Sequence, residues 1–242
     1  MKEKLVFGIS EFFKGAGKKT AVLGLSGGVD SAVVCALLAG ALGKENVFAY
    51  YLPYKKLEMD DSVDRIHARE VAQKFGVNFE EKSIFSALHS ISNLCSSADR
   101  LELGNTCSRL RMICLYNFAK QKDAIVVGTG NKSELMTGYF TKFGDGGCDV
   151  LPIGCLLKRD VLQLAGNLGV PNAVIEKAPS AGLWEGQTDE GEMGLTYKKL
   201  DEILEVFPNF SDEDDVEFKK IKFLFNRSAH KREMPKVLNV LE

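Results

Sequence analysis

One short segment, residues 25–31 (LSGGVDS), carries the residue types and spacing best suited to chemistry. Consecutive glycines allow backbone N–H groups to turn toward one point, and the N-terminus of a following helix adds unpaired N–H groups and the positive end of its dipole. Ser26 and Ser31 add hydroxyl donors. The segment is therefore predicted to bind phosphate, the alternative being a tight turn with an ordinary helix cap.

Asp30 is the unusual member of this segment, because a bare carboxylate repels phosphate. A Mg²⁺ ion between the two would remove the conflict, since it binds oxygens of both. Glu134 is the candidate for a second carboxylate on that ion, with an ordinary acid in the first turn of a helix as the alternative. Lys158 could balance phosphate charge. The chain contains neither G-x-x-x-x-G-K-[ST] nor G-x-G-x-x-G, which excludes nucleotide loops of those two kinds.

The elements that must position these residues alternate between strand and helix. Strand patterns that stop at glycine or proline alternate with helical spacing as far as residue 128, which predicts a parallel sheet with helices on both faces. Ligands of such sheets bind beyond the carboxyl ends of the strands, where the strand order reverses. The predicted strands are 20–25, 46–52, 77–82 and 123–127, with 150–153 a further strand or an extended segment. The predicted helices are 30–42, 60–75, 83–94, 99–120, 158–168, 196–206 and 212–225.

Composition narrows the classes of function. The chain has 31 basic and 33 acidic residues, so its charge balance provides no field for nucleic acid or an anionic membrane. Its six cysteines form no C-x-x-C pair and it has three histidines, so we expect reduced thiols rather than a zinc site. Neither a signal peptide nor an apolar run of the ~20 residues that span a membrane is present. These features predict one cytoplasmic domain over residues 1–242.

Three later segments narrow the substrate. The first is residues 105–111 (NTCSRLR), and the second is residues 128–149 (GTGNKSELMTGYFTKFGDGGCD), followed by 151–153 (LPI). The third begins at residues 157–159 (LKR) and continues through residues 178–194 (APSAGLWEGQTDEGEMG). Segment 25–31 resembles the S-G-G-x-D-S loop of the PP-loop ATP pyrophosphatases, which cleave ATP to AMP and pyrophosphate. The three later segments resemble the NAD synthetases of that superfamily in order and spacing. The resemblance covers roughly residues 20–232, and its most specific part is 128–149.

The resemblance implies an adenine nucleotide alpha hydrolase-like fold, doubly wound and mostly parallel, with a helical C-terminal region. It implies roles for individual residues too. Asp30 and Lys158 would be catalytic, and Asp30 and Glu134 would hold Mg²⁺. Asp30 and Lys158 would also contact ATP, together with Gly24, Leu25, Ser26, Gly27, Gly28, Val29, Ser31, Thr129 and Ser180. The residues implied to contact deamido-NAD are Arg109, Lys142, Asp149, His230 and Lys231.

The residues alone leave several of these roles open. Arg109 could equally be a solvated helix residue, and Lys142 and Asp149 could flank an ordinary flexible hairpin. His230 and Lys231 could be surface polar residues or part of a closing lid. The acidic run 211–215 is better explained as a helix cap than as a metal site. Two positions depart from the family, which often has Gln where this chain has Val29 and Thr where it has Ser180, although Ser180 retains a hydroxyl.

The resemblance also implies a reaction. The nicotinate carboxylate would attack ATP to form an acyl-adenylate, and ammonia would then displace AMP and give NAD. We expect free ammonia, or ammonia delivered by another protein, because no segment supplies an amidohydrolase site. We also expect a homodimer, as in the family. Segments 144–147 and 178–194 are predicted to be mobile loops. The alternatives are another PP-loop enzyme, such as a GMP-synthetase-type subunit or a tRNA thiolase, a module that binds ATP without turnover, or a scaffold with a decayed site.

Overall fold

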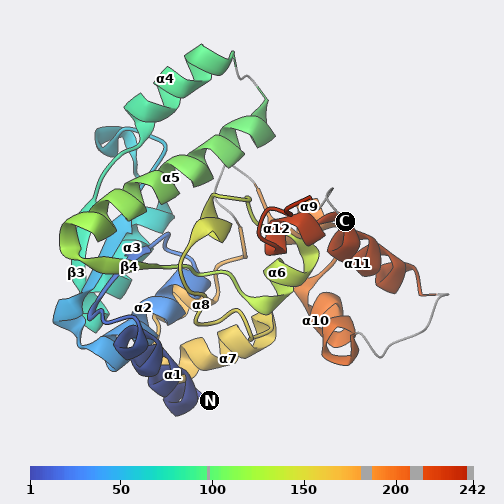
Figure 1. The fold of residues 1–242 in the computed structure, drawn as a ribbon, viewed down its shortest axis with the longest axis horizontal. Coiled ribbons are helices and arrows are strands. Elements are labelled where there is room, and N and C mark those ends of the chain that lie inside the picture. Colours follow the sequence, from blue (N-terminus) through green and yellow to red (C-terminus); the bar gives the residue numbers. More distant parts are fainter. Residues whose placement is uncertain (97–98, 181–186, 208–214, 239–242) are drawn as a thin grey trace.

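A four-stranded parallel sheet forms the centre of the protein. The computed structural model describes residues 1–96, 99–180, 187–207 and 215–238 (Figure 1). The strands are β1 (Thr20–Gly24), β2 (Val47–Tyr51), β3 (Asn78–Glu81) and β4 (Ala124–Val127). Their order is β3-β2-β1-β4, and every pair is parallel. Ala21 pairs with both Val47 and Ile125, so β1 lies between β2 and β4. The parallel sheet predicted from the sequence is confirmed.

Side chains alternate between the two faces of this sheet, as the pleat of a strand requires. Ala21 and Leu23 lie in one buried cluster with the helices on the first face, whereas Val22 lies in a second cluster with α5. The first face carries α1 (Lys2–Gly15), α2 (Val29–Leu42), α3 (Val63–Phe75), α7 (Lys158–Leu168) and α8 (Asn172–Ile175). The second face carries α4 (Phe85–Cys95) and α5 (Arg100–Lys122), so helices cover both sides as predicted.

The remaining helices lie beside the sheet, and most of them contribute to a third buried cluster. It contains Leu200, Leu204 and Ile221, which are almost wholly buried. Figure 1 shows these helices together, away from the strands and close to the described C-terminal end. They are α6 (Lys132–Thr137), α9 (Asp189–Met193), α10 (Tyr197–Val206), α11 (Val216–Arg227) and α12 (Ala229–Arg232). The helical C-terminal region expected from the family resemblance is therefore present in the described residues.

Helix boundaries follow local capping. Residues 158–168 form α7 as predicted, and Thr196 and Asp215 cap α10 and α11 with side-chain oxygens. The helix predicted from residue 60 begins at Val63, because Ser62 caps it and Leu57–Met59 forms a separate 3₁₀ turn. Residues 211–214 of the acidic run lie outside the described part of the chain. The segment 150–153 is not a full strand, since only Val150 forms an isolated parallel bridge, to Val127.

Sequence reasoning missed α1 and the short helices α8, α9 and α12. The α1 residues mix charged and apolar types, and the helix is fixed by burying Ile9 and Phe13 against the core. Helices of four or five residues lack the length to be stable in isolation, so tertiary contacts determine them. Among the described helices, none has the length and apolar character needed to cross a membrane.

Candidate active site

The candidate site lies where the strand order reverses. The chain leaves β1 toward α2 and leaves β4 toward α6, and between these two connections lies a cavity of about 1060 Å³. Such a crevice at the carboxyl edge of a parallel sheet is the usual ligand position in folds of this kind. Segment 25–31 and residues 128–130 both contribute to the lining. The structure thus brings together the two regions in which sequence reasoning placed the chemistry.

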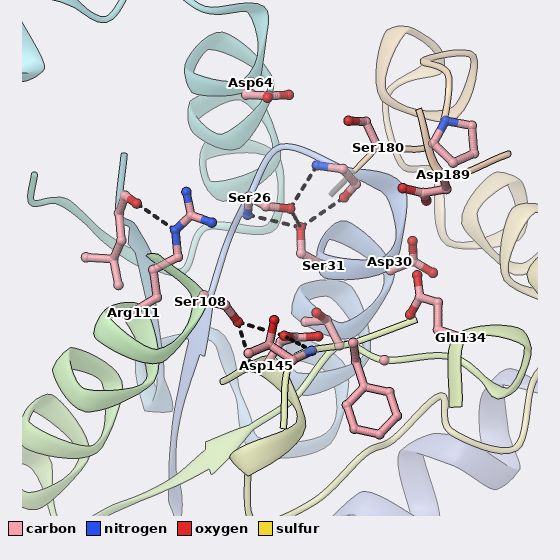
Figure 2. A pocket seen from close by; sticks show the side chains of 18 of the residues that line it. Ser26, Asp30, Ser31, Asp64, Ser108, Arg111, Glu134, Asp145, Ser180 and Asp189 are labelled. Carbon is pink, nitrogen blue, oxygen red and sulfur yellow. Dashed lines mark hydrogen bonds between the residues drawn. The ribbon is translucent and has the colours of Figure 1, made fainter. Parts of the chain in front are cut away.

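Segment 25–31 forms a compact turn before α2. The Ser31 hydroxyl donates to the Gly28 carbonyl at 2.9 Å, and the Ser26 backbone N–H donates to the Ser31 Oγ at 3.2 Å. Figure 2 shows the two serine side chains side by side at the start of α2, where their oxygens are 3.1 Å apart. The turn therefore places two hydroxyls and the N-terminus of α2 on one side of the cavity, an arrangement suited to an anion.

Gly27 is required at its position for two independent reasons. Its φ of +83° is in the left-handed region that favours glycine. A Cβ atom there would also lie 2.2 Å from the backbone carbonyl oxygen of Asp64, in the first turn of α3. The turn therefore lies directly against the backbone of α3, with no room for a side chain at residue 27.

Asp30 and Lys158 form a buried ion pair at the end of this turn. Their side chains are 17% and 3% exposed. Asn131 connects the pair to the second connection, because its side-chain amide donates to Asp30 Oδ1 at 2.9 Å while its backbone N–H donates to Glu134 Oε2 at 3.0 Å. The Asn131 side chain also caps α6. Glu134 therefore lies in the first turn of α6, and it also lies near Asp30, to which Asn131 connects it.

Three ionisable side chains meet in this group, and their charges change the pKa of Glu134 and the pKa of Lys158. Burial raises the pKa of the Glu134 carboxyl well above its usual range, and the nearby Asp30 charge raises it further. Burial by itself would lower the pKa of Lys158, but the Asp30 and Glu134 carboxylates outweigh it, so the pKa is raised. Lys158 is therefore held as a cation between two acids that repel one another.

Asp30 and Glu134 fit the requirements of a Mg²⁺ ion. Proteins usually hold this ion with one or two carboxylates and leave its other positions to water and phosphate oxygens. Figure 2 shows Asp30 and Glu134 approaching each other beside the turn, where phosphate would lie. Within the described ranges, no group of three or more His, Cys, Asp or Glu side chains could hold a metal ion. The arrangement fits an ion shared with a bound phosphate better than an ion enclosed by protein alone.

Asp189 and Tyr197 lie against Lys158 and were not identified from the sequence. The Tyr197 hydroxyl donates to Asp189 Oδ2 at 3.0 Å, and the Lys158 ammonium lies 5.2 Å from the centre of the Tyr197 ring. Asp189 is 4% exposed, and its other oxygen has no hydrogen-bond partner among the described residues. Burial raises the pKa of Asp189, although the Tyr197 hydroxyl and the Lys158 charge lower it. Thr188 before Asp189 signals a helix start, but nothing local signals this pairing.

The predicted ATP contacts are gathered around the cavity. Thr129 and Ser180 line it together with most of segment 25–31, while Gly27 lies behind the lining against α3. The predicted mobile loop 178–194 is divided, because α9 forms within it and residues 181–186 lie outside the described residues. The lining residues from the predicted ATP set are Gly24, Leu25, Ser26, Gly28, Val29, Asp30, Ser31, Thr129, Lys158 and Ser180.

The predicted deamido-NAD residues are only partly gathered there. Lys231 lines the cavity and donates to the carbonyls of Gly138 and Phe140 at 2.8 and 2.7 Å. Arg109, Lys142, Asp149 and His230 are outside this lining. Arg109 donates to the Lys142 carbonyl, Lys142 donates to the His230 carbonyl, and Asp149 accepts from Tyr116 and from the Val126 backbone at 2.8 Å each. Their contacts join the segment after α6 to α5, β4 and α12.

The glycine-rich segment 144–147 is held in place by hydrogen bonds. Asp145 Oδ1 accepts from the Ser108 hydroxyl at 2.7 Å and from the Thr141 backbone at 2.9 Å, and Thr141 donates to Asn105 at 2.8 Å. Gly144 is packed so closely that a Cβ atom would lie 2.3 Å from Ser108 Oγ. Ser108 and Asp145 line the cavity and were missed by the sequence analysis, which treated this segment as a free loop.

Fold and site together define an α/β protein whose first strand is followed by a glycine-rich turn with a geometry suited to an anion, called the anion-binding turn below. The family model described as NAD synthase matches residues 1–235. The NH(3)-dependent NAD(+) synthetase of Archaeoglobus fulgidus is 45% identical to this chain, covering 98% of it and 97% of the relative.

Two solved structures are similar over nearly their full lengths. The NMN synthetase of Francisella tularensis is 38% identical with a TM-score of 0.87, covering 98% of this chain and 97% of that one. The NH3-dependent NAD synthetase of Campylobacter jejuni, solved with a nitrate ion, is 31% identical with a TM-score of 0.84 and the same coverage. The chain therefore belongs to the NAD synthase family of C–N bond-forming ligases.

Proposed function

We propose that this protein amidates deamido-NAD to NAD with free ammonia and ATP, through an acyl-adenylate, and releases AMP and pyrophosphate. The observation that carries the proposal is the Asp30–Lys158–Glu134 group beside an anion-binding turn. The similarity to NH(3)-dependent NAD(+) synthetases over almost the whole chain supports the choice of substrates. The alternatives weighed from the sequence, a sensing module and a decayed scaffold, lack that support.

The first half-reaction joins the nicotinate carboxylate to the α-phosphorus of ATP. A carboxylate oxygen forms the new bond to phosphorus, and the bond from phosphorus to the oxygen that bridges to the β-phosphate breaks, so the pyrophosphate leaves with that electron pair. Bound Mg²⁺ on Asp30 and Glu134 would supply positive charge at the phosphates. Lys158 stabilises the negative charge that develops on the pyrophosphate, and the N-terminus of α2 with Ser26 and Ser31 fixes its position.

The second half-reaction replaces AMP by nitrogen. The lone pair of ammonia attacks the acyl carbon, and the bond from this carbon to the oxygen of AMP breaks, so AMP leaves with that electron pair. The nitrogen then gives one proton to water, and the amide remains. Within this proposal, Thr129 and Ser180 contact ATP, while Arg109, Lys142, Asp149, His230 and Lys231 contact deamido-NAD. The chain would act as one cytoplasmic domain within a homodimer.

A second candidate substrate follows from the resemblance to the Francisella NMN synthetase. Nicotinic acid mononucleotide carries the same reacting carboxylate but lacks the adenylate half of the dinucleotide. The chemistry at segment 25–31 would be unchanged, so this turn does not distinguish the two substrates. Discrimination must come from residues outside it.

One assay tests both candidates. Purified protein is incubated with ATP, Mg²⁺ and ammonium plus either deamido-NAD or the mononucleotide, and AMP and the amide product are separated by chromatography. Ammonium-dependent NAD with an equal amount of AMP supports the proposal, whereas preferential formation of NMN moves the assignment to the second candidate. Neither amide with either substrate would reject both. Asp30→Ala serves as the control, in which turnover is expected to be lost, and chemical denaturation of the same variant measures the destabilisation caused by leaving Lys158 without its partner.

A further inference from the structure

A second lysine–carboxylate pair lies at the same cavity. The Lys177 ammonium, just after α8, pairs with Asp64 Oδ1 in the first turn of α3. Both residues line the cavity, and their side chains are 28% and 29% exposed. None of the roles proposed above uses this pair. It differs from the Asp30–Lys158 pair chiefly in its contact with solvent.

The pair stands directly at the anion-binding turn. Asp64 is the residue whose backbone carbonyl contacts Gly27 so closely that a Cβ atom there would lie 2.2 Å from it. In the view of Figure 2, Ser26 and Ser31 lie between Asp64 on one side and Asp30 on the other. The turn is therefore flanked by two acids, each of which holds one lysine.

We propose that Lys177 is a further nucleotide-binding residue. When ATP binds, the Lys177 ammonium moves from Asp64 to the β- and γ-phosphates, and it then contacts the pyrophosphate that these phosphates form. An ion pair that keeps contact with water is weaker than a fully buried one, so releasing Lys177 costs little. The triphosphate presents several negative charges and attracts the lysine more strongly than one carboxylate does. Asp64 holds the lysine beside the turn when no nucleotide is bound.

The position of Lys177 suits contact with the leaving pyrophosphate rather than with the α-phosphate, where the new bond forms. Pyrophosphate must depart while the acyl-adenylate stays protected from water for ammonia to attack. The buried Lys158 suits the bond that breaks between the α- and β-phosphates, whereas the partly exposed Lys177 suits the outer phosphates, at the end from which the pyrophosphate leaves. The assignment rests on the proposed function, because it requires the turn to hold the phosphates of ATP.

The competing explanation is that the pair only fastens α8 to α3. In that case loss of either partner would loosen the same contact. Lys177→Met and Asp64→Asn would then have effects of the same sign on every nucleotide. If Lys177 instead moves to phosphate, the two changes have opposite effects, because Asp64→Asn removes a competitor for the lysine.

The test is to measure ATP and AMP affinity of the full-length chain by calorimetric titration with Mg²⁺ present. Lys177→Met is expected to weaken ATP binding about tenfold and to leave AMP binding within about twofold. Asp64→Asn is expected to tighten ATP binding about threefold, and Lys177→Arg to retain most of the affinity for ATP. Lys74→Met is the matched control, since Lys74 is exposed in the last turn of α3, outside the cavity lining, and its loss changes net charge equally.

Several results would overturn the inference. Equal loss of ATP and AMP binding in Lys177→Met, or weaker ATP binding in Asp64→Asn, would assign the pair a fastening role. An unchanged ATP affinity in Lys177→Met would remove the lysine from the site while the proposed function stands. Wild-type protein that binds neither nucleotide would instead remove the proposed function, and the inference with it. Because Asp64→Asn predicts a gain, the test does not depend on Lys177→Met folding well.

Discussion

The two lysine–carboxylate pairs beside the anion-binding turn have the same chemistry but different surroundings. Lys158 and Asp30 are 3% and 17% exposed, whereas Lys177 and Asp64 are 28% and 29% exposed. A charge removed from water must always have a partner, because an unpaired buried ion is very costly. A charge that keeps water around it can exchange partners at little cost. We therefore expect the buried Asp30–Lys158 pair to stay together and the more exposed Asp64–Lys177 pair to exchange partners.

The largest expected effect comes from removing the buried cation. Lys158→Met leaves the carboxyls of Asp30 and Glu134 without a cation and with only the hydrogen bonds from Asn131, so we expect a loss of about 3–5 kcal/mol in the free energy of unfolding. Lys177→Met should lose no more than about 1 kcal/mol. Chemical denaturation of both variants measures the difference. The double variant Lys158→Met/Asp30→Asn should recover part of the loss, and equal stability of the two single variants would contradict the comparison.

A smaller effect is expected from the backbone contact that joins the turn to Asp64. Gly27→Ala places a Cβ atom 2.2 Å from the Asp64 carbonyl oxygen at a φ of +83°, so we expect a loss of about 2–3 kcal/mol and weaker ATP binding. Gly28→Ala is the matched control. Its φ is −91° and its Cβ would meet only Ser26 Oγ at 3.4 Å. If denaturation shows equal losses for the two alanines, the contact with α3 is not the reason for Gly27.

The smallest expected effect comes from the Arg65 contacts that hold the start of α3. Arg65 pairs with Glu81 and also donates to the carbonyls of Leu57 and Asp60, which fixes the start of the helix that carries Asp64. Arg65 and Arg69 together lower the pKa of Glu81 from 4.5 to about 2. Glu81→Gln should therefore cost about 1 kcal/mol at neutral pH.

The stabilisation that the Glu81 carboxylate contributes should fall as the pH falls. Because the folded-state pKa of Glu81 is depressed, its stabilisation is complete above the unfolded pKa of 4.5 and is lost as the pH falls toward 2. The difference in unfolding free energy between wild type and Glu81→Gln should shrink between pH 6 and about pH 3. A difference that stays constant over this range would show that the two arginines do not stabilise the carboxylate.

Local sequence patterns predict much of the fold, and they also predict the side of the site formed by residues 25–31. The turn at 25–31 and its following helix are encoded by neighbouring residues, and α7 has the predicted bounds. The segments after β1 and β4 could be placed together because parallel strands end at the same edge of the sheet. Lys158 was chosen as a candidate for its charge and its family resemblance, and the structure supplies its partner, Asp30.

Partners that are distant in the chain could not be predicted from one sequence. Asp64 and Lys177 are 113 positions apart, and each is an ordinary charged residue in its own segment. Tyr197 and Asp189 are closer, but their contact depends on how α9 and α10 pack. The same holds for α1, since burial of Ile9 and Phe13 is visible only once the core exists. Charge and hydrophobicity show which residues need partners, while tertiary packing determines which partners they find.

The central position of β1 has a consequence for synthesis of the chain. β1 and β2 can pair as soon as residues 20–51 have emerged, and the anion-binding turn directly follows β1. Its other neighbour, β4, ends at Val127, and Lys158 follows Asp30 by 128 positions. During translation Asp30 therefore exists for a long interval without the cation that neutralises it in the folded protein. That carboxylate must stay hydrated until then, so the site can close only after α7 has been made.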